Sequence, residues 1–408
     1  MNEFMIRSDH LNNGKKLTGI MDKKSIRSFG KGFFCRMRKA MNACCVPSGL
    51  VISIEILRRF IVPLMVVGLI STGILKLPIF NTNPKPVVVL VDPHHRERVH
   101  SFVRSVLSKE CRPSFTRRGI ESIYSSSVAE PFLQKNSNLT EQMFEYQPPF
   151  GFRNLQHKLK EILDLLPISL SENTGGHDCR RCVVVGNGGI LRGLELGPLL
   201  NQFNVILRLN SGPVRDFSRD VGNRTTIRMS YPEGSPKIWE DVDPQLWFVA
   251  VIYKSVDFNW LHAVISRTTV SLWDKLFFWQ KVPSSIPVDP SRFRILNPEI
   301  IRETAFKLLQ YPNPKPRQWG WDQNIPTLGV SAVNLATYLC DEVSLAGFGY
   351  NLSQKEIPLH YYDSLPMTAM LKQPMHNVDH ETVFLQRLIA AGSILDLTGG
   401  VHCSFCSA

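Results

Sequence analysis

The sequence predicts an α/β fold in which a mostly parallel β-sheet is flanked by helices and is preceded by a single transmembrane helix. The sheet follows from short apolar runs that alternate with amphipathic stretches, the pattern of β-strands separated by helices. These runs lie at 183–185, 205–209, 247–252 and 343–347. The transmembrane helix follows from an uncharged run that begins at Phe60. Of the 408 residues, 43% are hydrophobic and 20% are charged, which excludes a disordered or collagen-like chain.

A basic tail precedes the uncharged run at 60–75. Residues 1–59 contain twelve lysines and arginines against four acidic residues. The run is long enough to cross a bilayer, and it extends to residue 80 if Lys76 snorkels to the headgroups; the alternative is a buried helix interrupted by Pro63. It starts too far along the chain for a cleaved signal peptide. Because positive charge stays on the cytosolic side, we expect a single-pass type II membrane protein with a cytosolic tail at 1–59 and a span at 60–80.

Most of the positive charge lies in that tail. The whole chain has a formal net charge of +12, of which residues 1–59 carry +8. The remaining residues are therefore nearly balanced at +4. A nucleic-acid surface needs clustered basic side chains, so this balance argues against nucleic acid as a partner.

Cysteines and sequons agree with a body that lies in an oxidising lumen. Six cysteines follow the apolar run, at positions 111, 179, 182, 340, 403 and 406, and six can pair completely. Two C-x-x-C units occur, but more than two hundred residues separate them, which argues against a shared zinc site. Three N-x-S/T sequons after the apolar run are candidate glycosylation sites, at Asn138, Asn223 and Asn351.

The segment at 81–150 contains scattered prolines and the serine run 125–127, which is typical of an irregular stem. Leucines and isoleucines then recur at helical spacing, which predicts an amphipathic helix over 153–166. We therefore expect the folded body at 151–408.

A glycine-rich loop, GNGG at 186–189, follows the first strand of that body. Such a loop lets a ligand reach backbone N–H groups, and at the start of a helix from Leu191 it would favour an anionic phosphate. Leu191 occupies the third glycine position of the dinucleotide motif G-x-G-x-x-G, and the second strand ends at Asn210 where that motif requires an acid. The loop therefore predicts a nucleotide site but not NAD; a tight turn with no ligand is the alternative.

A second glycine cluster, at 347–349, follows a helix expected from Ser331 and the strand at 343–347. In parallel sheets the ligands lie beyond the carboxyl ends of the strands, so the two glycine clusters would face one cleft. A disulfide between Cys182, on the first strand, and Cys340, just before the later one, would hold these strands together.

Two histidine groups follow the second glycine cluster. His360 begins the sequence HYYD, and His376 opens an apolar-periodic helix that also contains His380. The positive end of a helix favours the neutral imidazole that a general base needs. A purely structural role for either histidine is the alternative.

Asp241 and Asp243 form a D-x-D pair. Such a pair can hold Mg²⁺ or Mn²⁺ on a nucleotide diphosphate. Because no apolar strand flanks it, we interpret the pair as part of a solvated loop.

The order and spacing of these blocks resemble the animal sialyltransferase family. Residues 182–226, with CVVVGNGG, VILRLN and GNRTT, are similar to its large motif, and 326–349 to its small motif. HYYD and the segment from His376 to Glu381 are similar to its third and very-small motifs. Other stretches resemble members that act on lactosylceramide: PPFGFR at Pro148, SVDFNW at Ser255, FRILNP at Phe293, CDEVSLAGFGY at Cys340 and PLHYYDS at Pro358. The Cys403/Cys406 pair and the basic tail depart from the family.

The resemblance implies a Rossmann-like fold, a variant of the glycosyltransferase A type, with a lumenal catalytic domain at 151–408. It implies transfer of N-acetylneuraminic acid from CMP-sialic acid to the 3-hydroxyl of the terminal galactose of lactosylceramide, with inversion and without metal or other cofactor. It further implies residence in the Golgi membrane, and a homo-oligomer or an assembly with other glycosyltransferases. Other galactose-terminated acceptors, or a catalytically silent lumenal scaffold, are the alternatives.

The resemblance also implies roles for individual residues. His376 would be the base that removes the proton from the galactose hydroxyl, His360 would meet the phosphate, and Glu381 would support its motif. The residues that bind CMP-sialate would be Asn187, Asn210, Gly329 and Gly349. The disulfides would be Cys182–Cys340 and Cys111–Cys179.

Two physical points concern the substrates. CMP-sialate has a single phosphate, so imidazole, backbone N–H groups and a helix terminus can stabilise the leaving group, a role that a diphosphate leaves to a metal. The aromatic run at 277–279 suits a glycolipid acceptor, although such a run is also typical of a core.

Overall fold

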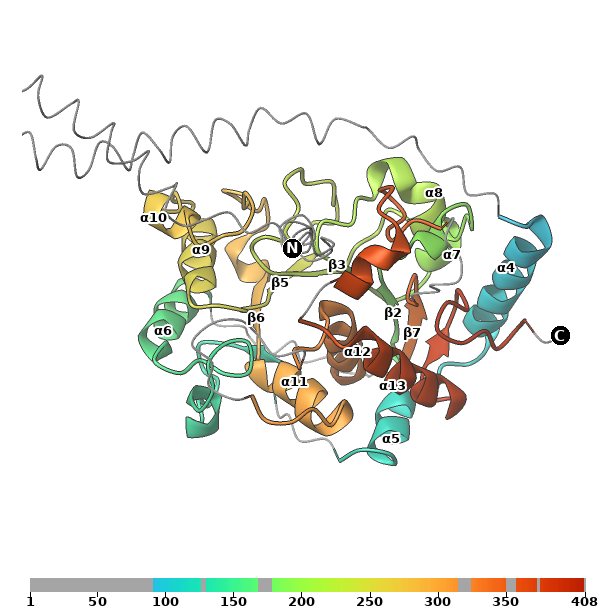
Figure 1. Cartoon of the computed structure of the whole chain (residues 1–408), viewed down its shortest axis with the longest axis horizontal. Helices are drawn as coiled ribbons and strands as arrows, with labels where there is room; N and C mark the ends of the chain where they lie inside the picture. Colours follow the sequence, from blue (N-terminus) through green and yellow to red (C-terminus); the bar gives the residue numbers. More distant parts are fainter. Residues whose placement is uncertain are drawn as a thin grey trace, which may run out of the picture. The chain divides into compact units, whose positions relative to one another are not determined.

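The protein is represented by a computed structural model that describes residues 91–125, 130–167, 178–314, 324–349, 357–372 and 375–406. The described chain forms an eight-stranded sheet in the order β1-β6-β5-β4-β3-β2-β7-β8, with helices on both faces (Figure 1). The predicted tail at 1–59 and span at 60–80 lie outside the described residues. Within the ranges that are described, no helix has the length and apolar character to cross a membrane.

The sheet is mostly parallel, as the sequence predicted. Every neighbouring pair runs parallel except β1 and β6, which pair antiparallel at one edge. The strands are β1 (Phe132–Leu133), β2 (Arg181–Val185), β3 (Val205–Leu209), β4 (Ile227–Ser230), β5 (Trp247–Ala250), β6 (Phe293–Leu296), β7 (Glu342–Ala346) and β8 (Leu395–Asp396). The predicted apolar runs thus correspond to β2, β3, β5 and β7.

Helices cover the two faces of the sheet. The longer ones are α4 (Pro93–Ser108), α6 (Gln156–Leu165), α9 (Val256–Ile265), α12 (Leu328–Leu339) and α13 (Val378–Ala390). The shorter ones are α5 (Phe115–Glu121), α7 (Gly197–Leu200), α8 (Ser218–Val221), α10 (Leu272–Lys275) and α11 (Pro298–Glu303), with 3₁₀ or π turns η2 (Glu141–Phe144), η3 (Gly189–Leu191), η4 (Arg215–Phe217), η5 (Pro290–Arg292), η6 (Thr304–Leu308) and η7 (Met367–Lys372).

The alternation of side chains along β2 shows how the layers form. Val184 packs with α11, α12 and α13 on one face, whereas Val183 and Val185 pack with α4 and α7 on the other. Further along the sheet, α6 and α9 cover β5 and β6 on that second face. Because β2 is apolar on both faces, it reads in the sequence as a continuous run of valines, as expected for a strand buried between two helical layers.

The segment 81–150 was predicted to be an irregular stem, and for its described part this is wrong. Pro93 opens α4, whose Val99, Val103 and Val106 pack beneath β2. Thr116 on α5 accepts a hydrogen bond from the backbone N–H of Val343 on β7. Proline is favoured in the first turn of a helix, where no N–H is needed, so Pro93 marks a helix start. The folded domain therefore begins before residue 151.

The helices near the predicted site also differ from expectation. The glycine loop at 186–189 leads only into the short η3 turn, not into a long helix from Leu191. Gly193 and Glu195, with positive φ of 76° and 54°, turn the chain away there. In contrast, α12 starts at Leu328, before the predicted Ser331, because the side chain of Thr327 caps its N-terminus.

Three disulfides are present in the described chain. Cys182–Cys340 joins β2 to the residue before β7, and Cys111–Cys179 fastens the α4–α5 region to the residue stretch before β2. These are the two pairs that the resemblance implied. Cys403 and Cys406 are joined to each other, so neither C-x-x-C unit has the thiolates that zinc would need.

Candidate active site

The sheet topology fixes where a ligand would bind. Strands β3 to β6 extend from one side of β2 and β7 lies on its other side, so the strand order reverses between β2 and β7. In open parallel sheets the crevice beyond the carboxyl ends of the strands at such a reversal is the usual ligand site. The predicted glycine clusters at 186–189 and 347–349 lie directly after these two strands.

The two glycine clusters are in direct backbone contact. The N–H of Gly186 donates to the Ala346 carbonyl (2.8 Å) and the N–H of Gly188 to the Gly347 carbonyl (3.0 Å). Gly349 has φ of +102°, and a Cβ there would lie 2.1 Å from the Gly400 carbonyl oxygen. Only glycine fits this conformation and this gap. The expectation that both clusters face one crevice agrees with this arrangement.

His360 lies against the first glycine cluster. Gly188 and His360 form an antiparallel bridge, and the N–H of Gly189 donates to the Leu359 carbonyl (3.1 Å). The Nδ1 atom of His360 is 2.5 Å from a carboxylate oxygen of Asp363, and the ring stacks on Tyr362 at 5.1 Å between centroids. Asp363 therefore holds the Nδ1 proton and orients the ring, which leaves Nε2 as the nitrogen for a ligand.

The predicted asparagines lie beside this segment. The carbonyl of Asn187 accepts from the N–H of Tyr361 (3.0 Å). Asn210, with φ of 52°, follows β3, and its side-chain oxygen accepts from the Ser230 hydroxyl (3.2 Å). Gly212 packs so closely on Asn187 that a Cβ would lie 2.4 Å from its amide oxygen. Asn187 and Asn210 therefore flank one continuous surface at the ends of β2 and β3.

His376 lies immediately before the N-cap residue of α13, Asn377. Its Nδ1 donates to the carbonyl oxygen of Ile325 (2.7 Å), since a carbonyl can only accept. In the neutral ring the lone pair then lies on Nε2. Burial lowers the pKa of His376, and the bond to Ile325 acts in the opposite direction. The sequence anticipated a neutral imidazole from the helix dipole, but burial is the main cause.

Glu381 connects α13 to α12. Its carboxylate is buried and accepts from the N–H (2.7 Å) and the hydroxyl (2.6 Å) of Thr327, the residue that caps α12. Burial raises the pKa of Glu381 to about 7, against the effect of these two hydrogen bonds. Gly329 follows in the first turn of α12, and a Cβ there would lie 3.1 Å from the ring of Phe348, which belongs to the second glycine cluster. The supporting role implied for Glu381 agrees with this geometry.

Two tyrosines that were not predicted as site residues lie just beyond the carboxyl ends of β4 and β5. Tyr231 follows β4, Tyr253 lies just after β5, and their rings meet edge to face at 5.2 Å. Burial raises the pKa of Tyr253, and the nearby charges of Tyr231 and Glu381 raise it further. The signal that could have identified them is their position directly after buried strands, at the same sheet edge as Asn187 and Asn210.

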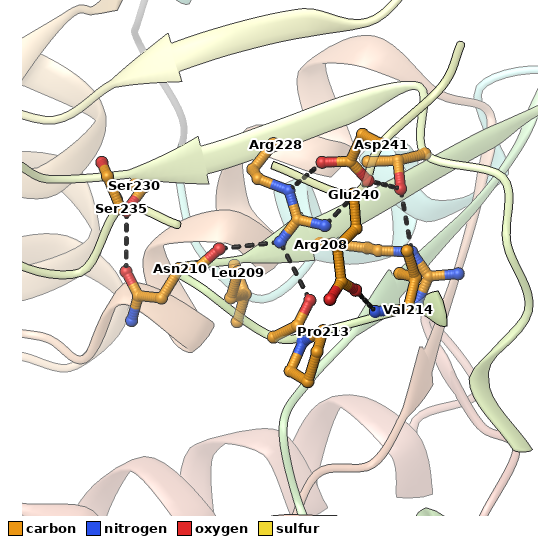
Figure 2. A network of polar contacts seen from close by, with 12 residues as sticks. Arg208, Leu209, Asn210, Pro213, Val214, Arg228, Ser230, Ser235, Glu240 and Asp241 are labelled. Atoms are coloured by element: carbon orange, nitrogen blue, oxygen red, sulfur yellow. Dashed lines mark hydrogen bonds and ion pairs between the residues drawn. The ribbon is translucent and has the colours of Figure 1, made fainter. Parts of the chain in front are cut away.

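Asp241 was interpreted as part of a solvated loop, and this is wrong. Its side chain is 2% exposed, as is that of Arg228, its partner on β4. The Arg228 guanidinium donates two hydrogen bonds to the Asp241 carboxylate, and the Thr225 hydroxyl donates a third (Figure 2). Within the described part of the chain, the carboxylate of Asp243 accepts one hydrogen bond, from the N–H of Gln245 (2.9 Å). The pair is therefore not a metal site, because an arginine occupies the carboxylate that a cation would need.

Arg228 also supports the loop that contains Asn210. Its Nη1 donates to the carbonyls of Asn210 (2.7 Å) and Gly212 (3.2 Å) (Figure 2). Nearby, Glu240 accepts from the N–H groups of Val214 (2.7 Å) and Arg215 (3.0 Å). The buried ion pair thus fixes the loop after β3 from beneath.

A cavity of about 300 Å³ lies beside this loop. Its walls come from β4, from the loops after β3 and β4 and from one residue beyond α10: Ser211, Gly212, Pro213, Arg228, Glu233, Ser235, Pro236, Lys237, Ile238, Glu240, Asp241 and Gln280. Gly212 thus touches Asn187 and also lines the cavity. The cavity therefore adjoins the surface that Asn187 and Asn210 flank.

The predicted glycosylation sites lie on the surface or outside the described residues. Asn138 and Asn223 are exposed, whereas Asn351 lies outside the described residues. Among the described side chains, no group of three or more histidines, cysteines or carboxylates is placed to hold a metal ion. Independence of metal stays a prediction.

Comparison with known proteins places these features in a family. A profile described as glycosyltransferase family 29 (sialyltransferase) matches residues 132–393. The lactosylceramide alpha-2,3-sialyltransferase of Rattus norvegicus is 51% identical over 316 residues, which cover 76% of this chain and 82% of the rat protein. The Homo sapiens protein of the same name is 52% identical over 319 residues, covering 77% of this chain and 76% of that protein.

More distant relatives and solved structures indicate the same family. The CMP-N-acetylneuraminate-beta-1,4-galactoside alpha-2,3-sialyltransferase of Homo sapiens is 38% identical over 295 residues, covering 71% of this chain and 77% of that protein. A crystal structure of a mammalian sialyltransferase superposes with a TM-score of 0.51 at 25% identity, covering 65% of this chain and 88% of that chain.

Proposed function

Because the chain belongs to glycosyltransferase family 29, the sialyltransferases, we propose that it transfers N-acetylneuraminic acid from CMP-sialic acid to the 3-hydroxyl of the terminal galactose of lactosylceramide. The observation that carries the acceptor assignment is the difference in identity between relatives. Those named for lactosylceramide are 51% and 52% identical to this chain, whereas one named for a beta-1,4-galactoside is 38% identical. The fold proposed with this function is the Rossmann-like variant of the glycosyltransferase A type.

The donor would bind at the strand reversal between β2 and β7. CMP would lie along Asn187 and Asn210, with Gly329 and Gly349 providing room for close approach of the nucleotide. The first turn of α12 contains Gly329, so the positive end of a twelve-residue helix would lie beside the pocket. In its doubly protonated form His360, whose Nδ1–H is held by Asp363, would donate its Nε2–H to the phosphate as the negative charge of the leaving group develops.

His376 would act as the general base. The oxygen of the galactose 3-hydroxyl attacks the anomeric carbon of sialic acid, and the bond from that carbon to the phosphate oxygen breaks, so that CMP leaves with the electron pair. The proton of the hydroxyl passes to Nε2 of His376. Its Nδ1 bond to Ile325 fixes the tautomer for this step, and burial keeps the ring neutral by lowering its pKa. Attack from the side opposite the leaving group gives inversion.

The enzyme would work in the Golgi membrane, with the span at 60–80 as anchor and the catalytic domain in the lumen. Its three disulfides support an oxidising compartment. Asn138 and Asn223 are exposed, as glycosylation there would require. Assembly into a homo-oligomer, or with other glycosyltransferases, is part of the same proposal.

The direct test uses the purified full-length chain in detergent with CMP-sialic acid and lactosylceramide, with and without EDTA. We expect an α2,3-linked product, inversion, and unchanged activity with chelator. Sialylation of glycoprotein galactose but not of lactosylceramide would overturn the acceptor assignment, and absence of CMP release with every acceptor would indicate a silent scaffold.

A pair of variants tests the base. His376→Ala should lose about 10²–10⁴-fold in kcat, the usual contribution of a general base, while CMP binding measured by calorimetry persists. The control is His380→Ala, four residues further on and exposed, which should keep its kcat. If the His376 variant keeps most of its kcat, the base is another residue.

A further inference from the structure

Four large apolar side chains are exposed within six residues of each other, on α10 and the turn that follows it. Leu272 is 79%, Trp273 77%, Leu276 73% and Phe277 68% exposed. Residues four apart lie on the same side of a helical turn, so Leu272 stands beside Leu276 and Trp273 beside Phe277. We call these four residues the α10 patch. Contiguous exposed apolar residues of this size usually mark an interaction site.

The α10 patch is held by a well-packed segment. Ser271 caps α10, and Asp274 turns inward to accept from the side chain of Asn259 on α9 (2.8 Å). The next aromatic residue, Phe278, is buried against the α9 core and has the Lys254 ammonium 4.7 Å from its ring centre. Because these neighbouring residues point inward and are bonded or buried, the fold itself holds the α10 patch in its exposed position.

A second exposed apolar pair lies beside the 300 Å³ cavity that adjoins the candidate active site. Ile238 is 75% and Val242 81% exposed, on the loop after β4. Ile238 lines the 300 Å³ cavity, and so does Gln280, three residues beyond Phe277. The Gln280 amide donates to the Glu233 carbonyl, which ties the two loops together. Apolar residues are therefore exposed on both loops that border the cavity.

We propose that the α10 patch, together with Ile238 and Val242, docks on the lipid bilayer that contains the acceptor. This inference rests on the proposed glycolipid acceptor. Lys237, Lys275 and Lys281 are exposed on α10 and on these two loops. Of the acids nearby, Asp241 is paired with Arg228, whereas Glu240, Asp243 and Asp274 accept hydrogen bonds from uncharged groups and keep their charge, so the apolar side chains indicate the occupant. Exposed tryptophan, leucine and phenylalanine bordered by lysines suit the headgroup interface of a bilayer, where apolar side chains enter and lysine chains snorkel.

The length of the chain before the domain agrees with this occupant. Ten residues, 81–90, separate the end of the predicted span from the first described residue, 91. Ten residues reach at most about 35 Å when extended, so the predicted anchor would keep the domain next to its bilayer. Docking through the α10 patch would then place the cavity beside Asn210 at the headgroup layer, where the sugar of a glycolipid projects.

The test compares two acceptors in the same proteoliposomes of phosphatidylcholine and phosphatidylserine containing the full-length chain. One acceptor is lactosylceramide in the bilayer and the other is soluble methyl lactoside. For Trp273→Asp/Phe277→Asp we expect kcat/KM to fall about tenfold or more with lactosylceramide, with no change for methyl lactoside or in thermal midpoint. The matched control is Ile123→Asp, a 42% exposed residue after α5, which should leave both rates unchanged.

Three results would overturn the docking proposal: equal rates of wild type and double variant in the bilayer, an equal loss with both acceptors, or a wild-type dimer that the double variant separates. A measurement independent of the acceptor keeps the outcomes apart. Lipids brominated in their acyl chains should quench wild-type tryptophan fluorescence more than that of Trp273→Phe. If the quenching difference is present but lactosylceramide is not sialylated, the acceptor assignment fails and docking stands; if the quenching is equal, docking fails.

Discussion

Replacing Asp241 by asparagine tests whether the D-x-D pair is structural. The asparagine has almost the same shape, but its NH₂ group would face the guanidinium of Arg228, which is also a donor. With its oxygen at the Oδ1 position, the asparagine keeps the hydrogen bonds from Nη2 of Arg228 and from the Thr225 hydroxyl, and loses the one from Nε of Arg228. Arg228 keeps its charge and loses its counter-ion in a site where both side chains are 2% exposed.

The size of the effect follows from that burial. Removing one partner of a buried ion pair costs about 3–5 kcal/mol of the free energy of unfolding, and the oxygen that asparagine retains places this variant near the lower value. Arg228 also donates to the carbonyls of Asn210 and Gly212. The substitution leaves these two bonds in place but lets the guanidinium shift, so the loop that contains Asn210 is held less firmly. We expect a loss of about 1.4 kcal/mol in donor binding, which would raise the KM for CMP-sialic acid about tenfold.

The assay is urea unfolding of the full-length protein in detergent, with the free energy obtained by linear extrapolation, together with initial rates over a range of CMP-sialic acid. Asp243→Asn is the control within the same motif. Its carboxylate accepts a single backbone hydrogen bond, so its effect on the free energy of unfolding should stay within about 0.5 kcal/mol.

The structural explanation would be refuted by either of two results. One is equal stability of the Asp241 and Asp243 variants. The other is an Asp241→Asn protein that unfolds like wild type but loses activity in a way that added Mn²⁺ restores. That second pattern is the one expected of a metal ligand.

Three further predictions concern other parts of the site and domain. Since burial lowers the pKa of His376 below 6.5, the base stays neutral as the pH falls through 6.5. The acid limb of the kcat–pH profile should therefore have its midpoint below pH 6.5. A midpoint above pH 6.5 would contradict the assignment of His376 as the base. Gly189→Ala places a Cβ 2.0 Å from the Pro358 carbonyl oxygen and should displace the segment that contains His360 from the glycine loop. We expect kcat/KM to fall about tenfold or more. An unchanged kcat/KM would show that this contact does not position His360. A chain that starts at residue 151 should be digested rapidly in limited proteolysis, because it lacks α4, α5 and β1, whereas a chain that starts at residue 91 should resist digestion. Equal resistance of the two chains would instead support a stem that extends to residue 150.

Much of the sheet could be predicted because its central strands are buried on both faces. Val183, Val184 and Val185 form an unbroken apolar run that reports this burial directly. The α4 helix was missed although Val99, Val103 and Val106 recur at helical spacing, since the scattered prolines and the serine run at 125–127 suggested a stem. The two-residue edge strands β1 and β8 are too short to leave a periodic signal.

The candidate site could be predicted only in part. His360, His376 and the glycine clusters were predicted because glycines and titratable rings stand out in a sequence, and their roles in the site stay predictions. Asp241 was misread because its burial depends on Arg228, which lies on β4, thirteen positions earlier in the chain. No local pattern records which side chain covers another.

The sequence by itself determined the α/β class, the glycine loops at the strand ends, the cysteine positions and the family that these motifs indicate. These features arise from short-range chemistry: alternating burial, glycine's conformational freedom and the fixed order of motifs. Only the tertiary structure decided that residues 91–125 and 130–150 belong to the domain, that Glu381 holds the start of α12 through Thr327, and that the α10 patch faces outward. Such contacts join residues far apart in the chain, and their energies depend on burial that is established only when the layers pack together.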